Sequence, residues 1–161
     1  MFNPGQQTGY PQRYFPVYPY TTEGAYPEAL RLIVESVQSE REDELFYDYL
    51  LTVAPSIKQK EIIVSIRDDE RKHNLMFREI FFQLTGRDRP PVNEEFQKPE
   101  SYLSGIERAL FGELRAVEKY RKILFGMAYL PFRNMVTEIY TDELKHASKW
   151  NYLYTTVMEA D

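Results

Sequence analysis

The pattern of apolar and polar residues changes near residue 27, and from there to the end of the chain apolar residues recur three and four positions apart. This spacing is typical of helices that bury one face. A glycine at position 86 and a proline at position 131 are a usual helix end and a favoured first-turn residue. The pattern predicts four helices, over residues 28–54, 57–85, 100–126 and 131–159.

The breaks between these segments indicate how the helices are connected. Two breaks are short, whereas the polar, proline-broken stretch over residues 87–99 holds 13 residues. An extended chain of that length reaches about 43 Å, and a 28-residue helix is about 42 Å long, so this stretch can run the length of a bundle. We therefore expect an all-α protein, a four-helix bundle of two antiparallel hairpins joined by a long crossover loop.

The first 27 residues differ in composition from the rest, with five prolines and five tyrosines. Such a segment favours extended or polyproline conformation over a packed helix. Two domains are predicted: a Pro/Tyr-rich tail over 1–27, and a bundle with two internal repeats over 28–161. The tail is either a flexible or surface-lying segment, or an arm for docking or cross-linking.

The two hairpins repeat each other at an offset of 73 residues. The offset places Asp69 over Asp142 and, within an E-x-x-H motif, Glu70 over Glu143 and His73 over His146, the only two histidines of the chain. Four further identical pairs are Glu40 and Glu113, Tyr47 and Tyr120, Leu51 and Leu124, and Ile66 and Ile139. The hairpins are predicted to be copies of one unit.

Six of these polar residues fall near the middle of the predicted helices, where apolar neighbours at helical spacing turn them inward. In a bundle of matched helices, mid-helix positions lie in one layer whichever way each helix runs. The sequence predicts that four carboxylates and two imidazoles meet there, from Glu40, Glu70, His73, Glu113, Glu143 and His146.

Four carboxylates in a dry core are costly unless they are protonated or bind cations. Two divalent ions would balance four negative charges, and a glutamate and a histidine three positions apart project from one helix face. The chain has no cysteine, so thiolate zinc sites and iron–sulfur clusters are excluded. Oxygen-rich ligation with one imidazole per ion suits iron or manganese, two ions per chain. The alternative is helical pairs that coincide by duplication and bind no metal.

Other polar residues have open roles. Tyr47 and Tyr120 are candidate catalytic residues, which would hydrogen-bond a ligand or donate an electron, or are plain core aromatics. Asp69 and Asp142 are favoured to orient the ligand histidines, with a solvent-facing position as the alternative. Glu44 is either an extra carboxylate near the site or, as we favour, a solvated position.

The residues Glu40 with Tyr47, "DERKH" over 69–73, Glu113 with Tyr120, and "DELKH" over 142–146 resemble the ferritin-like superfamily, specifically rubrerythrin-like di-iron proteins, over residues 28–159. The resemblance implies that Glu40 and Glu113 are terminal ligands, Glu70 and Glu143 bridging ligands, and both histidines terminal ligands. Two departures matter. Rubrerythrins carry a further glutamate where this chain has Ala116, and usually a cysteine-ligated rubredoxin domain.

The predicted function is that of a di-iron or dimanganese oxidoreductase that reduces peroxide or dioxygen with electrons from an external donor. The alternatives are ferroxidase and iron storage, which would need a hollow oligomer, and a metal-stapled structural protein like those of spore coats. The net charge of −5 and interleaved Lys and Arg argue against a nucleic-acid partner. Without an apolar span or signal peptide, we expect no membrane partner and a cytoplasmic protein, with association with spores as the alternative. A homodimer is one candidate assembly.

Overall fold

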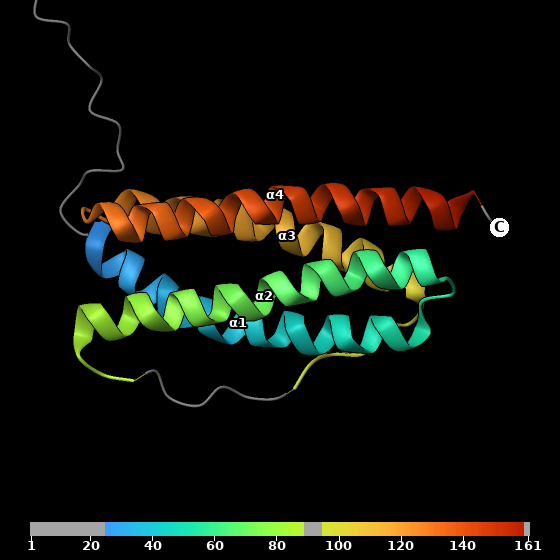
Figure 1. The fold of residues 1–161 in the computed structure, drawn as a ribbon, viewed down its shortest axis with the longest axis horizontal. Coiled ribbons are helices and arrows are strands. Elements are labelled where there is room, and N and C mark those ends of the chain that lie inside the picture. Colours follow the sequence, from blue (N-terminus) through green and yellow to red (C-terminus); the bar gives the residue numbers. More distant parts are fainter. Residues whose placement is uncertain (1–24, 89–94, 160–161) are drawn as a thin grey trace, which may run out of the picture.

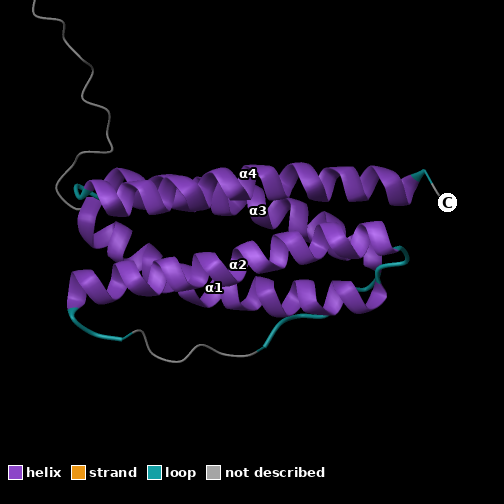
Figure 2. Cartoon of the chain, in the orientation of Figure 1, coloured by secondary structure: helices purple, strands orange, loops and turns teal. Residues whose placement is uncertain are grey.

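The computed structural model describes residues 25–88 and 95–159, which form a bundle of four long helices and contain no strand (Figures 1 and 2). Every predicted helix is present, with bounds within three residues of the expected ones. The prediction of an all-α four-helix bundle is confirmed. The helices are α1 (Ala25–Val53), α2 (Ile57–Thr85), α3 (Tyr102–Gly126) and α4 (Leu130–Met158).

The helix ends follow local sequence signals. Ser56 accepts a hydrogen bond from the backbone N–H of Gln59 at the start of α2, and Ser101 forms a capping box with Ser104 at the start of α3. Gly86 ends α2 with φ of 68°, a left-handed conformation that glycine adopts without steric cost. Pro131 lies in the first turn of α4, as predicted.

Helix α1 includes residues 25–27, which the composition had assigned to the tail. Pro27 is compatible with this because the first turn of a helix has no acceptor for its backbone N–H groups. The remainder of the predicted tail, residues 1–24, lies outside the described residues.

The two hairpins, α1–α2 and α3–α4, pack so that α1 runs antiparallel to α3. Gly105 near the start of α3 lies against Leu50 near the end of α1, and Gly126 at the end of α3 lies against Ala25. The end of α2 lies beside the start of α1, where Thr85 and Pro27 line one surface pocket. The connection after α2 therefore leads from one end of the bundle to the other, as expected for a crossover (Figure 1).

The interior holds two apolar clusters separated by a polar layer. One cluster combines the first half of α1 and α4 with the second half of α2 and α3; the other combines the opposite halves. Between them, all six predicted ligand side chains are at most 3% exposed. The apolar clusters thus hold the four helices in register on either side of this layer. Within the described residues, no helix is long and apolar enough to cross a membrane.

Helices α1 and α3 approach each other closely at Gly126, so a larger side chain there should destabilise the bundle. A methyl group at this position would lie 2.4 Å from the backbone oxygen of Ala25 and 2.5 Å from the Cβ of Ala29. Neither atom belongs to a flexible side chain, so we expect Gly126→Ala to lower the free energy of unfolding by about 1–3 kcal/mol. Thermal unfolding followed by circular dichroism measures the change.

The matched control is Gly112→Ala in the same helix. There the added methyl meets only the guanidinium of Arg115, at 4.0 Å. The better helix propensity of alanine should then raise the free energy of unfolding by up to about 1 kcal/mol. Equal stabilisation by both substitutions would contradict the close packing of α1 on α3.

Candidate metal centre

The six predicted ligand residues form two overlapping groups in the middle of the bundle. In each group, one ligand atom from every residue lies within 4.8 Å of the others. Both groups contain the two glutamates of the E-x-x-H motifs, which therefore lie between the two positions. The first group is Glu40, Glu70, His73 and Glu143, and the second is Glu70, Glu113, Glu143 and His146. The structure brings all six together.

Each histidine turns Nδ1 toward the carboxylates. The Nδ1 atom of His73 is 3.0 Å from Glu143 Oε1 and 3.5 Å from Glu70 Oε2. The Nδ1 atom of His146 is 3.2 Å from Glu70 Oε1 and 3.7 Å from Glu113 Oε2. Each imidazole thus shares one small space with carboxylates from both hairpins.

Several atoms that face this space are buried and make no hydrogen bond of good geometry to any described residue, although two of them approach each other to 3.0 Å. They are Glu40 Oε2, Glu70 Oε1, Glu143 Oε1 and the Nδ1 atoms of His73 and His146. Buried polar atoms are almost always hydrogen-bonded, because an unpaired one costs about 1–3 kcal/mol. Five such atoms in one layer, all from residue types that ligate metals, fit two divalent cations.

The electrostatics of the cluster lead to the same conclusion. Burial, followed by the neighbouring carboxylates, raises the pKa of Glu70 and Glu143 well above the usual range. Burial acts in the same direction on Glu40 and Glu113, but their hydrogen-bonding neighbours outweigh it and lower the pKa of both. Without cations, four carboxylates in this space cannot all be ionised at neutral pH. A metal pair would take the place of the retained protons.

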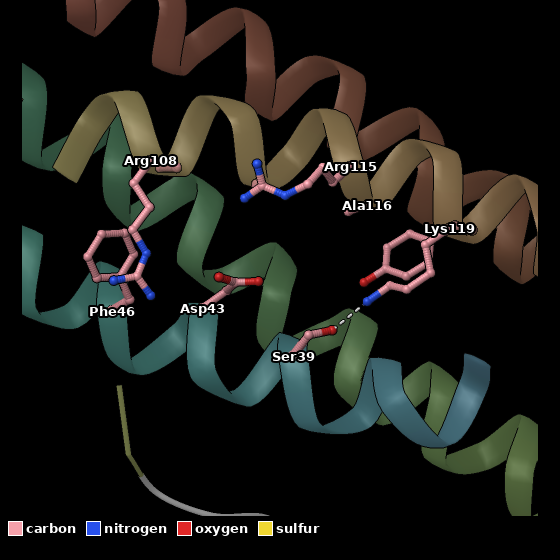
Figure 3. Close-up of a pocket in the computed structure, with 10 residues that line it drawn as sticks. Ser39, Asp43, Phe46, Arg108, Arg115, Ala116 and Lys119 are labelled. Carbon is pink, nitrogen blue, oxygen red and sulfur yellow. Dashed lines mark hydrogen bonds between the residues drawn. The ribbon is translucent and has the colours of Figure 1, made fainter. Parts of the chain in front are cut away.

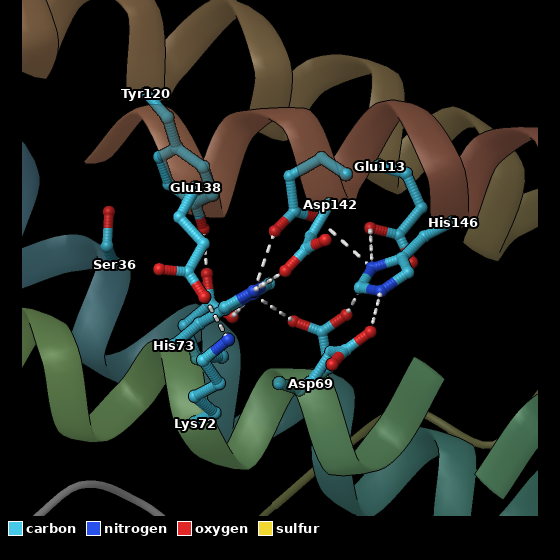
Figure 4. Close-up of polar contacts among 12 residues, drawn as sticks. Ser36, Asp69, Lys72, His73, Glu113, Tyr120, Glu138, Asp142 and His146 are labelled. Atoms are coloured by element: carbon cyan, nitrogen blue, oxygen red, sulfur yellow. Dashed lines mark hydrogen bonds and ion pairs between the residues drawn. The ribbon is translucent and has the colours of Figure 1, made fainter. Parts of the chain in front are cut away.

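The far nitrogen of each histidine meets an aspartate of the other hairpin (Figure 4). Nε2 of His73 is 3.3 Å from Asp142 Oδ2, and Nε2 of His146 is 3.0 Å from Asp69 Oδ2. A carboxylate at Nε2 places the proton there and leaves Nδ1 free to bind a metal. This is the orienting position that the sequence analysis favoured for both aspartates.

Lys145 holds both aspartates, with its ammonium 2.6 Å from Asp142 and 3.1 Å from Asp69. Its counterpart in the first repeat, Lys72, instead pairs with Glu138 (Figure 4). The two halves therefore support the histidines unequally.

The two predicted tyrosines also cross between the halves. The buried hydroxyl of Tyr47 donates to Glu113 Oε1 at 2.8 Å, and that of Tyr120 donates to Glu40 Oε1. Both hydroxyls bond the glutamate of the other half, and this leaves Glu40 Oε2 facing the ligand layer. Tyr47 and Tyr120 therefore contact the predicted ligands through hydrogen bonds, in addition to packing in the core.

Trp150 is a further contact residue that the sequence analysis did not single out. Its indole N–H donates to Glu113 Oε1 at 3.0 Å, and its ring centroid lies 5.0 Å from that of Tyr47. The residue 73 positions earlier is Phe77, which packs on Tyr120 but has no hydrogen to donate. The sequence could have indicated this contact, because a buried tryptophan usually donates its N–H to a hydrogen-bond acceptor.

Glu44 and Asp43 of α1 lie close in sequence to Glu40 but belong to neither ligand group. Glu44 is only 8% exposed and pairs with Arg41 at 2.6 Å and Arg71 at 2.5 Å, so the expectation of a solvated position is wrong. The two arginines compensate its burial. Asp43, which the sequence analysis did not single out, has a pKa raised well above its usual range by burial and then by the carboxylates of Glu113 and Glu40.

Comparison with known proteins agrees with the fold and the cluster. The Rubrerythrin family matches residues 31–154 of the chain. The crystal structure of a conserved hypothetical protein from Mycobacterium tuberculosis has a TM-score of 0.69 and 12% identity, and the match covers 82% of this chain and 99% of that one. At this identity the likeness concerns the fold. A search of curated proteins finds no match.

The family match spans all four helices and every residue of the buried acidic and histidine cluster, whose arrangement is compatible with a di-metal site. It covers 124 of the 161 residues, counted from 31 to 154. The chain belongs to the rubrerythrin family, a family of ferritin-like di-iron carboxylate proteins.

Proposed function

We propose that this protein binds two iron or manganese ions per chain and reduces peroxide or dioxygen with electrons from an external donor. The observation that carries the proposal is the set of five buried ligand-type atoms that lack a hydrogen bond and face one layer. Glu40 and His73 would hold one ion, Glu113 and His146 the other, and Glu70 and Glu143 would serve both.

When bound, such ions supply redox chemistry, passing between the +2 and +3 states and giving one electron each. Reduction of one peroxide takes two electrons and two protons and yields two waters. Two ions that give one electron each would supply the two electrons that one peroxide requires. The burial of all six ligands, at 0–3% exposure, restricts access to small molecules.

The side chains around the ligands would hold the geometry. Asp142 and Asp69 keep the imidazoles in the tautomer that presents Nδ1, and the Tyr47, Tyr120 and Trp150 donors fix the terminal carboxylates. The two tyrosines are also the nearest phenols from which an electron or a proton could come. Since the chain has no cysteine, the electron donor must be another protein or ferrous iron.

Metal content is the first test. Protein reconstituted anaerobically with ferrous iron should contain about two ions per chain, and the His73→Ala, His146→Ala double variant should lose most of them. The control is Glu118→Gln, an exposed residue of α3, which should leave the content unchanged. Elemental analysis gives the count. Less than about 0.2 ion per chain in the unaltered protein would rule out the proposal.

Proton release tests the ligand chemistry separately. Burial would lower the pKa of His146, but Glu113 and Glu143 outweigh it and raise the pKa to about 10, so this imidazole carries a proton at pH 7 without metal. Binding must displace protons from the histidines and from Glu70 and Glu143. We therefore expect affinity for Mn²⁺ to rise with pH between about 5 and 8.

Calorimetric titration of Mn²⁺ in two buffers of different ionisation enthalpy counts the released protons. At least one proton per chain is expected at pH 7. A binding enthalpy that is the same in both buffers, or an affinity that falls with rising pH, would contradict the assigned ligands.

Turnover separates catalysis from a purely structural metal site. The iron-loaded protein should consume peroxide faster than the same amount of free iron, and Tyr47→Phe and Tyr120→Phe should each slow it about 10- to 100-fold, because each removes a hydrogen bond to a ligand. Tyr152→Phe, a 44% exposed tyrosine, is the control. Consumption no faster than that of free iron would favour the metal-stapled structural alternative. Growth of a retained iron mineral in a hollow oligomer would favour storage.

A further inference from the structure

A pocket lies between α1 and α3, and Tyr120, the hydrogen-bond donor to Glu40, forms part of its wall. The histidines come from α2 and α4, so the pocket lies on the side of the bundle away from the helices that carry the imidazoles. Its other walls include Phe46, Ala109, Gly112 and Ala116. The small residues of α3 leave the space open, and Ala116 is the position where rubrerythrins have a glutamate.

The volume of the pocket is about 240 Å³. A protein cavity of about 150 Å³ can hold benzene, and one water occupies about 30 Å³ in the liquid. The space therefore exceeds what a peroxide or dioxygen molecule requires. It has room for a small organic molecule with an apolar part the size of a benzene ring.

Cations surround this pocket, although the whole chain carries a net charge of −5. Lys119 donates to Ser39 at 2.7 Å, and Arg108 donates to the backbone oxygen of Gln97 at 2.7 Å while lying 4.5 Å from the ring of Phe46. Arg115, which lies between them on the same helix, has no hydrogen bond or ion pair within the described residues. Its guanidinium is available to an anionic ligand.

Asp43 extends from α1 into the same space, facing α3, which carries Arg115 (Figure 3). Among residues 25–88 and 95–159, no hydrogen bond or ion pair of 4.0 Å or less joins Asp43 to any of the three cations. Burial, followed by the carboxylates of Glu113 and Glu40, raises the pKa of Asp43 well above its usual range. When Asp43 is protonated, an acceptor placed between Arg115 and Asp43 meets a donor on each side.

We propose that this pocket binds a small organic carboxylate, whose oxygens contact Arg115 and Asp43 and whose apolar part packs on Phe46 and the small residues of α3. A planar guanidinium matches the two oxygens of a carboxylate, and the apolar walls suit a carbon skeleton better than an inorganic anion. Binding involves no covalent step and does not require that the metal centre turn over.

Benzoate is the probe, and benzamide is its neutral counterpart of the same shape. Titration of the full-length protein followed by calorimetry should show saturable binding of one benzoate per chain and binding of benzamide at least about tenfold weaker. Arg115→Gln should weaken benzoate binding about tenfold, the loss expected for one hydrogen bond to a charged group. Arg121→Gln, on an exposed turn of the same helix, should leave it unchanged.

A second variant tests the space itself, independently of charge. Ala116→Leu should fill the pocket and abolish benzoate binding without a change in helix content by circular dichroism. Equal binding of benzoate and benzamide, or an unchanged affinity in both Arg115→Gln and Ala116→Leu, would overturn the proposal.

The titrations are run on metal-loaded protein and on protein treated with a chelator. Binding in both states supports the pocket. Binding that appears only with metal and is unaffected by Arg115→Gln would show that benzoate ligates the metal instead, which also overturns the proposal. Failure of metal loading, by contrast, would contradict the proposed function and leave the benzoate titration of the chelated protein interpretable.

Discussion

The structure depends on how the bundle accommodates four carboxylates in its interior. Glu40, Glu70, Glu113 and Glu143 lie within one layer, between two apolar clusters that give no compensation for charge. Each buried ion carries an effective penalty of several kcal/mol, which only close cations or protons can offset. Within the described residues, no arginine or lysine forms an ion pair with these glutamates, and their close partners are His73 and His146.

Around this layer, the two halves of the repeat differ in what they offer the ligands. Glu113 accepts hydrogen bonds from Tyr47 and Trp150, whereas Glu40 accepts one from Tyr120. A carboxylate with two donors is a weaker electron donor to a bound cation than a carboxylate with one. The duplicated sequence thus gives two positions of similar shape whose carboxylates differ in electronic character.

Much of this architecture follows from the sequence. Helical spacing, the glycine at 86 and the proline at 131 located the helices, and the offset of 73 residues located the six residues of the buried cluster. The sequence could not predict which side chains contact each other across the bundle. That Asp142 meets His73, or that Trp150 meets Glu113, depends on the rotation of each helix about its own axis. Periodicity determines this rotation only to within a broad face.

The prediction for Glu44 was wrong for the same reason. A solvated position was favoured for this glutamate, but Arg41 of α1 and Arg71 of α2 cover it. The pocket beside Asp43 could not be predicted from the sequence either. A space between two helices forms where small side chains of one helix face the other, and the sequence does not show which residues face each other. Ala109, Gly112 and Ala116 appear in the sequence as ordinary helix positions and become a wall only once α1 is in place.

The crossed contacts between the halves make each hairpin depend on the other. Tyr47 donates a hydrogen bond to Glu113, and Tyr120 donates one to Glu40. In the same crossed way, Asp69 contacts His146 and Asp142 contacts His73. Each of these four bonds joins the two hairpins, so a single hairpin would hold an incomplete set. Two identical hairpins related by a twofold axis would satisfy the same four contacts. Such a symmetric pair could not carry Trp150 at one position and Phe77 at the equivalent one, so this difference between the two halves requires both hairpins in a single chain.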